Sequence, residues 1–182
     1  MARRLALDHP DAVTKLALLD IVPTSTIYAK LDLRRATTVW RYFFLIQPPD
    51  LPERLVGSQA DAYLEWTLEE WCGTPGALSE AALAEYRRCF DAATTHAGCE
   101  DYRAGATIDL AHDRADGDRR IACPVLVLWS ADGLGSSYDV IAVWRTEADD
   151  LRGRALDCGH FLAEERPDKV ASELFAFLDD AD

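Results

Sequence analysis

Two short, continuous runs of apolar residues, far apart in the sequence, constrain the fold of this chain more than any other feature. The first lies within Lys15–Pro23 (KLALLDIVP) and the second within Cys123–Trp129 (CPVLVLW). Neither run alternates between apolar and polar residues, as a strand with one face in water would. Continuous apolar strands are typical of parallel sheets whose two faces are both covered by helices. The sequence therefore predicts an α/β fold built on parallel strands.

The segments around these runs complete the pattern. Residues 2–8 have the composition of a helix, which Pro10 ends. After the second run we expect a helix over Asp139–Glu147, a short third strand over Arg154–Cys158, and a last helix that opens at Pro167, since the fixed φ of proline suits the first turn of a helix. The apolar positions predicted to lie along one side of the last helix are Val170, Leu174, Phe177 and Leu178.

Between the two runs the spacing of apolar residues becomes helical. Leu64, Leu68 and Trp71 recur with the period of a helix, and Ser79 stands where it would cap the next one. Clusters of proline and glycine at 47–52 and 73–76 separate such segments, which predicts about five short helices. The expected domain organisation is a core segment at 1–23, an inserted helical cap at 24–116, and a second core segment at 117–182.

Composition excludes several classes of partner and location. The chain has 182 residues and a net charge of −13, and a surface this acidic repels nucleic acid and anionic membranes. Its five cysteines are an odd number without a C-x-x-C pair, which favours reduced thiols over disulfides or a zinc site. No signal peptide or membrane-spanning segment is evident, so the sequence indicates a cytoplasmic protein that binds neither nucleic acid nor membrane.

Three polar residues follow the predicted strands, at the edge of the sheet where parallel α/β folds place their reactive groups. Asp20 ends the first strand, Asp132 follows the second, and His160 follows the third. A histidine held by a carboxylate acts as a general base near neutral pH, and the order acid before histidine is that of an α/β-hydrolase. The other histidines, His9, His96 and His112, are interpreted as surface residues.

A non-catalytic interpretation stands beside the enzymatic one. A single loop histidine is often a surface residue, and an aspartate after a strand is often a turn residue. In that case the chain is a helical binding module, whose partner surface is formed by Tyr63, Trp66 and Trp71 and whose acidic charge attracts a basic partner.

Five separated segments, in the same order along the chain, resemble the haloacetate (fluoroacetate) dehalogenases. They are Leu16–Thr24 (LALLDIVPT), Phe43–Pro48 (FFLIQP), Leu51–Arg54 (LPER), Cys99–Gly105 (CEDYRAG) and Cys158–Glu165 (CGHFLAEE). The resemblance runs from Met1 to about the last helix. It implies the C-terminal portion of an α/β-hydrolase fold, with three core parallel strands and an inserted helical cap.

The resemblance also implies an activity and site residues. In this family an aspartate displaces halide from the α-carbon of a small halogenated carboxylate, and a histidine-activated water then hydrolyses the aspartyl ester. His160 matches the base and Asp20 matches the acid that orients it, with Asp132 as the second choice for that acid. Tyr102 matches the cap tyrosine that donates a hydrogen bond to the leaving halide. No cofactor or metal is implied, and a homodimer stays open.

The chain departs from the family at the halide site. Where the family has a His-Trp pair before Phe-Phe-Leu, this sequence has Arg41 and Tyr42. Both can donate hydrogen bonds, but their reach differs from that of an imidazole and an indole. Chlorinated and brominated acids, and other α/β-hydrolase substrates such as esters or epoxides, therefore remain alternatives to fluoroacetate.

A second departure concerns the nucleophile. The family's nucleophile lies on a Gly-x-Asp-x-Gly elbow before the orienting acid, and neither this pattern nor Gly-x-Ser-x-Gly occurs in the sequence. We expect the elbow to be encoded just upstream of Met1, and we expect this chain alone to release no halide. The strand that should pair with the first apolar run is also absent from the sequence. The open, apolar edge of the strand formed by the first run is therefore expected to promote association between chains.

Overall fold

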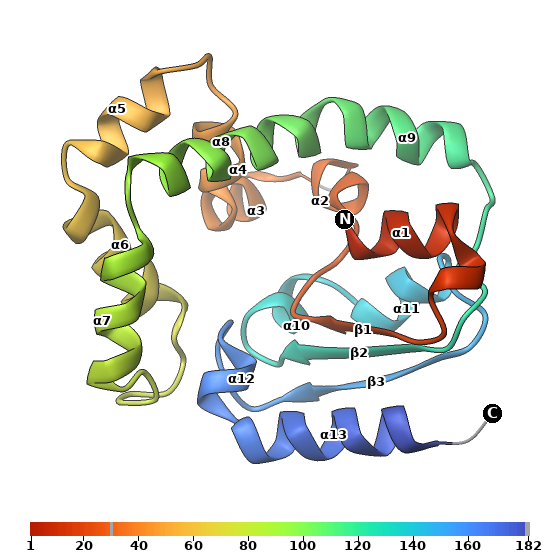
Figure 1. The fold of residues 1–182 in the computed structure, drawn as a ribbon. Coiled ribbons are helices and arrows are strands. Elements are labelled where there is room, and N and C mark those ends of the chain that lie inside the picture. Colours follow the sequence, from red (N-terminus) through yellow and green to blue (C-terminus); the bar gives the residue numbers. More distant parts are fainter. Residues whose placement is uncertain (30, 181–182) are drawn as a thin grey trace. The chain divides into compact units, whose positions relative to one another are not determined.

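The computed structural model describes residues 1–29 and 31–180, which fall into two compact units (Figure 1). The sheet unit comprises Met1–Val22, Trp71–Ala77 and Asp118–Asp182. The helical unit comprises Pro23–Glu70 and Leu78–Gly117. Most of the segment between the two apolar runs thus forms a unit of its own, whereas Trp71–Ala77, within that segment, groups with the sheet.

The sheet has three parallel strands in the order β1-β2-β3, which confirms the predicted α/β class. Strand β1 is Leu16–Leu19, β2 is Val125–Ser130 and β3 is Leu151–Leu156. β1 lies within the first predicted apolar run, and β2 lies within the second except for its last residue, Ser130. The predicted bounds of the third, Arg154–Cys158, were wrong, because only Leu156 of β3 is buried and no apolar run marks where the strand begins.

A glycine inside β3 also weakened its signal in the sequence. A Cβ atom at Gly153 would lie 2.0 Å from the carbonyl oxygen of Val127, so this close approach of β3 to β2 requires glycine. Glycine has a low strand propensity. Gly153 therefore permits β3 to pair with β2 and also weakens the strand pattern in the sequence.

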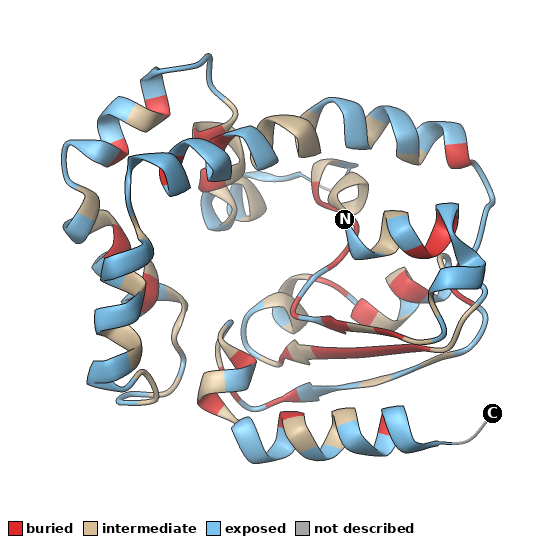
Figure 2. Cartoon of the chain, in the orientation of Figure 1, coloured by how far each residue is buried: buried red, intermediate tan, exposed pale blue. Residues whose placement is uncertain are grey.

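Strand β2 is buried almost throughout, as Figure 2 shows. Leu126 and Leu128 form one core cluster with Val170 and Phe177. Successive side chains of a strand point to opposite faces, so Val125 and Val127 point away from that cluster, and they are at most 1% exposed. Both faces of β2 are therefore covered, which explains its continuous apolar sequence.

The helices of the sheet unit begin and end mostly as the sequence indicates. The last helix opens at Pro167 as predicted, and Val170 and Phe177 are buried, but Leu178 was wrongly assigned to the buried side, since it is 57% exposed. The helical elements are α1 (Ala2–Asp8), the 3₁₀ turn η1 (Pro10–Ala12), α10 (Leu134–Ser137), α11 (Val140–Arg145), α12 (Leu162–Glu165) and α13 (Pro167–Asp179).

The chain between β1 and β2 contains eight helices among its described residues, more than the predicted five or so. Several have only six or seven residues, too few to show a clear periodicity in the sequence. Ser79 caps α7 as predicted, with its hydroxyl accepting from the amide of Ala82 at 3.1 Å. The eight are α2 (Thr24–Ala29), α3 (Leu33–Thr38), α4 (Trp40–Leu45), α5 (Leu51–Gly57), α6 (Ala60–Trp71), α7 (Glu80–Cys89), α8 (Ala92–Ala106) and α9 (Ile108–Asp116).

No helix in residues 1–29 and 31–180 combines the length and the apolar character that crossing a bilayer requires.

Candidate active site

The register of the parallel sheet brings three polar residues together at the carboxyl ends of its strands. Leu19 of β1 pairs with Leu128 of β2, so Asp20 lies level with Trp129, and its carboxylate reaches the amide of Ser130, the last residue of β2. Ser130 in turn pairs with Leu156, the last residue of β3, and His160 follows four residues later. This edge of the sheet unit is the candidate active site.

The carboxylate of Asp20 is buried and accepts several hydrogen bonds. Asp20 is 6% exposed, and its Oδ1 accepts from the amide of Ser130 at 2.8 Å and from the Ser130 hydroxyl at 2.9 Å. Its Oδ2 lies 2.7 Å from Nδ1 of His160. Asp20 has a φ of 48°, a left-handed conformation that few residues other than glycine adopt without strain. These contacts hold the backbone in that conformation and aim the carboxylate at the imidazole.

The imidazole of His160 has one nitrogen on Asp20 and a side chain that is 44% exposed. A carboxylate only accepts hydrogen bonds, so Nδ1 carries the proton of this contact and Nε2 is left to accept a proton from water. The ring also lies edge-on to the indole of Trp71, with 4.9 Å between the ring centres. This geometry is that of a general base whose tautomer is set by a carboxylate.

The structure distinguishes between the two candidate acids by position. Asp20 contacts His160, whereas Asp132 is exposed in the turn that follows β2, and no hydrogen bond or ion pair joins it to His160 in the described part of the chain. His9, His96 and His112 are all exposed, in line with their interpretation as surface residues.

Ser130 is a site residue that the sequence did not reveal. It is fully buried, donates its hydroxyl proton to Asp20, and accepts the amide of Leu134 at 3.0 Å. A serine at the end of a strand is ordinarily a turn residue. Only the register of β1 against β2 shows that this hydroxyl reaches the carboxylate.

Arg41, Tyr42 and Tyr102 lie in the helical unit. Arg41, on α4, is 4% exposed, and its guanidinium lies over the rings of Trp66 at 4.6 Å and Trp40 at 5.0 Å. It also donates a hydrogen bond to the Thr67 hydroxyl at 3.0 Å. The guanidinium thus lies against two tryptophan rings whose centres are 5.9 Å apart, an arrangement that stabilises a buried cation.

The phenols of Tyr42 and Tyr102 lie next to each other, with 5.0 Å between ring centres and the rings nearly perpendicular. Burial raises the pKa of Tyr102 above its ordinary value of 10, and the positive charge of Arg41 partly offsets this effect. The Tyr102 phenol therefore keeps its proton at neutral pH and is a hydrogen-bond donor. Of the aromatic residues considered for a partner surface, Tyr63 and Trp66 belong to the helical unit and Trp71 to the sheet unit.

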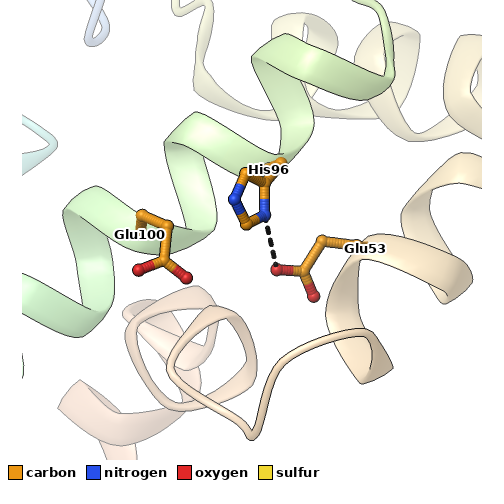
Figure 3. A group of neighbouring side chains, drawn as sticks. All are labelled: Glu53, His96 and Glu100. Carbon is orange, nitrogen blue, oxygen red and sulfur yellow. Dashed lines mark ion pairs between the residues drawn. The ribbon is translucent and has the colours of Figure 1, made fainter.

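One group of side chains in the helical unit has the composition of a metal site (Figure 3). Glu53 of α5 and His96 and Glu100 of α8 have ligand atoms within 4.8 Å of one another. However, Arg103 binds both carboxylates, that of Glu53 at 2.7 Å and that of Glu100 at 2.6 Å. The hydrogen bond from Arg103 lowers the pKa of Glu53 to about 2. A single guanidinium already binds both carboxylates and offsets one of their two negative charges, so the group is an ion-pair network that joins α5 to α8.

No protein-family model matches the chain, but curated proteins are similar to it. A fluoroacetate dehalogenase from Burkholderia sp. is 40% identical over an alignment of 182 positions that covers 98% of this chain and 60% of that protein. A soluble epoxide hydrolase from Corynebacterium sp. (strain C12) is 28% identical over an alignment of 179 positions that covers 95% of this chain and 61% of that protein. The chain thus spans about three fifths of the length of these relatives.

Solved structures are similar over the same extent. A proposed α/β hydrolase from Nostoc sp. PCC 7120 has a TM-score of 0.96 and 52% identity, and the match covers 99% of this chain and 62% of that chain. A proposed epoxide hydrolase from Pseudomonas aeruginosa has a TM-score of 0.91 and 40% identity, with 97% of this chain and 61% of that chain covered.

Proposed function

We propose that this chain, which belongs to the α/β-hydrolase superfamily, supplies the histidine–aspartate pair of a hydrolase that removes halide from a small halogenated carboxylate. The superfamily and the predicted fold class follow from the close structural match to an α/β hydrolase. The observation that carries the catalytic part of the proposal is the 2.7 Å contact between Asp20 Oδ2 and His160 Nδ1. The choice of substrate is supported by the similarity to the fluoroacetate dehalogenase.

The proposed reaction has two steps. A carboxylate nucleophile attacks the α-carbon of the substrate, the carbon–halogen bond breaks with its electron pair leaving on the halide, and an ester forms. His160 Nε2 then takes a proton from water, the resulting hydroxide attacks the ester carbonyl, and the hydroxy acid leaves as the carboxylate is regenerated. The chain has no Gly-x-Asp-x-Gly elbow to carry this nucleophile. The role of the His160–Asp20 pair is therefore the second step.

The halide needs hydrogen-bond donors as negative charge develops on it. In this proposal Tyr102 and Tyr42 donate to the halide, and Arg41 contributes positive charge. The burial that raises the pKa of Tyr102 supports its role as a donor, because the phenol stays protonated.

Opening of an epoxide is the second candidate reaction. The soluble epoxide hydrolase from Corynebacterium is similar to this chain over 95% of this chain's length. A pair of adjacent phenols such as Tyr42 and Tyr102 suits an epoxide, whose oxygen must receive a proton when the ring opens.

The test of this proposal supplies the missing nucleophile in a chimeric protein. The part of the Burkholderia dehalogenase that the match leaves uncovered is joined to this chain, and halide release is followed with fluoro-, chloro- and bromoacetate, with an epoxide as the competing substrate. We expect this chain alone to release no halide and the chimera to turn over. In the chimera, His160→Ala should release about one halide per active site and then stop, because the ester forms but is not hydrolysed.

The control is His112→Ala in the same chimera, since His112 is an exposed histidine on α9. It should turn over as the unmodified chimera does. A folded chimera in which His160→Ala turns over as fast as His112→Ala would contradict the proposal. Turnover of the epoxide but of no haloacid would favour the second candidate reaction.

A further inference from the structure

Three consecutive amides in the loop that carries His160 are bound by acceptors within the sheet unit. The Gly159 amide donates to Oε2 of Glu165 at 2.8 Å, and the Phe161 amide donates to Oε1 of the same carboxylate at 3.1 Å. The amide between them, that of His160, donates to the carbonyl oxygen of Trp71 at 2.8 Å. The backbone is thus held on both sides of the residue that bears the imidazole.

The Glu165 carboxylate is buried, and its hydrogen bonds to the Gly159 and Phe161 amides account for its position. Glu165 is the last residue of α12 and is 5% exposed. Burial of a carboxylate is unfavourable unless hydrogen bonds replace its hydration. Here each oxygen accepts one backbone amide, from Gly159 and from Phe161. An apolar side chain would fill the same space without that cost, so the charge is best explained by the two amides.

The segment Trp71–Ala77 supports the same loop from another side. A Cβ atom at Gly159 would lie 2.2 Å from the amide nitrogen of Gly73 and 2.4 Å from the carbonyl oxygen of Trp71. The two backbones therefore touch directly, which only glycine permits. Arg166 adds a hydrogen bond to the Thr74 hydroxyl at 3.0 Å. The segment and the loop are held as one piece.

We infer that Glu165 is a positioning residue for His160, because it fixes the amides of Gly159 and Phe161 while the carbonyl of Trp71 fixes the amide of His160. A general base must be held within a fraction of an ångström of its working position. Asp20 fixes the ring of His160 through Nδ1, and Glu165 fixes the backbone from which the ring projects. The consequence for catalysis rests on the proposed function, whereas the fixing of the loop does not.

The test is amide hydrogen exchange and proton NMR on the purified full chain. In the wild type, the amides of Gly159, His160 and Phe161 should be protected although they lie in a loop. Glu165→Gln keeps the volume of the side chain but places an NH₂ group against one of the two amides. Exchange at Gly159 and Phe161 should accelerate by about tenfold or more, as expected when a hydrogen bond to a charged acceptor is lost. The low-field resonance of the His160 Nδ1 proton should broaden or disappear.

The matched control is Glu173→Gln, which removes a carboxylate of α13 that pairs with Arg154 at 2.8 Å and has no contact with the loop. It should leave both readouts at their wild-type values, and the Val127 amide in β2 should be unchanged in every variant. Exchange at Gly159 and Phe161 within about twofold of wild type in a folded Glu165→Gln protein would overturn the inference.

If Glu165→Gln does not fold, the wild-type protein gives the answer. Should its Gly159 and Phe161 amides exchange as fast as the amide of Asp132, in the exposed turn after β2, that result alone would overturn the inference. The result is also separate from the proposed function. A chimera that folds but releases no halide refutes the activity, and the exchange data still decide whether Glu165 holds the loop.

Discussion

The sheet unit and the helical unit hold their polar residues by different means. In the sheet unit, the carboxylates of Asp20 and Glu165 accept backbone amides at the ends of strands and in a loop. In the helical unit, the guanidinium of Arg41 lies over the rings of Trp40 and Trp66, which are themselves in contact. The first arrangement depends on the direction of single hydrogen bonds, and the second depends mainly on shape and charge.

This difference determines which substitutions are informative in each unit. A change of one atom, such as oxygen to nitrogen in Asp→Asn, reverses a donor and an acceptor and should be severe in the sheet unit. Contacts of a cation with rings vary gradually with distance. In the helical unit, the same kind of conservative change should therefore alter stability by a moderate amount.

The largest effect is expected for Asp20→Asn. The substituted amide retains the size of the carboxylate, but its NH₂ group opposes either the Ser130 amide or the proton on His160 Nδ1. In a chimera that turns over, the rate of ester hydrolysis should fall by about 10³- to 10⁴-fold, as when a histidine loses the carboxylate that sets its tautomer. Rapid-quench measurement of ester formation and decay separates the two steps, and Asp132→Asn is the control. Equal rates of ester decay in the two variants would remove Asp20 from the site.

A smaller effect is expected for Ser130→Ala. The buried hydroxyl donates to Asp20 at 2.9 Å, and its loss leaves the carboxylate with one donor fewer. Ester hydrolysis should slow by about tenfold to a hundredfold, the cost of a hydrogen bond to a charged group. Ser136→Ala is the control, because that exposed hydroxyl donates only to the carbonyl oxygen of Gly133. If both variants hydrolyse the ester equally fast, the Ser130 hydroxyl has no part in positioning Asp20.

The sequence pointed to the candidate catalytic residues of the sheet unit more readily than to the residues that contact them. The strands that lead to Asp20 and Ser130 are visible in the sequence as apolar runs, and β2 is buried on both faces, as is typical of a parallel strand. The register that joins these ends is a long-range property, so the role of Ser130 was not visible. Glu165 lies in one of the motifs, but the sequence does not mark it as a positioning residue, since a glutamate near a helix end is ordinarily exposed.

The helical unit was harder to divide into elements. Its first four helices have six or seven residues each, and the boundaries depend on contacts between helices rather than on periodicity. Arg41 was recognised from a motif, but no pattern in the sequence showed that its guanidinium lies over both Trp40 and Trp66, because Trp66 is on another helix.

Arg41→Lys tests the aromatic arrangement of the helical unit. Lysine keeps the positive charge but loses the planar group that lies over Trp66 and the hydrogen bond to Thr67. The free energy of unfolding in urea should fall by about 1–2 kcal/mol. Arg87→Lys is the control, because Arg87 forms an exposed ion pair with Glu65. This substitution should lower the free energy of unfolding by less than about 0.5 kcal/mol. A loss for Arg41→Lys no larger than the control would show that the rings do not stabilise the guanidinium.

The smallest effect is expected at Glu53, and it should depend on pH. Hydrogen bonding to Arg103 lowers the pKa of Glu53 to about 2 from an ordinary value of 4.5. A carboxyl group whose pKa is depressed by folding stabilises the protein above its ordinary pKa, and this stability is lost as the pH falls toward the depressed value. At pH 7, Glu53→Gln should lower Tm by about 2–4 °C, equivalent to about 1 kcal/mol. The difference from wild type should shrink steadily between pH 4.5 and pH 2.5, whereas Glu69→Gln, an exposed change on α6, should show little difference at any pH. A difference in Tm that stays constant from pH 7 to pH 2.5 would show that the ion pair between Glu53 and Arg103 is not the source of this stability.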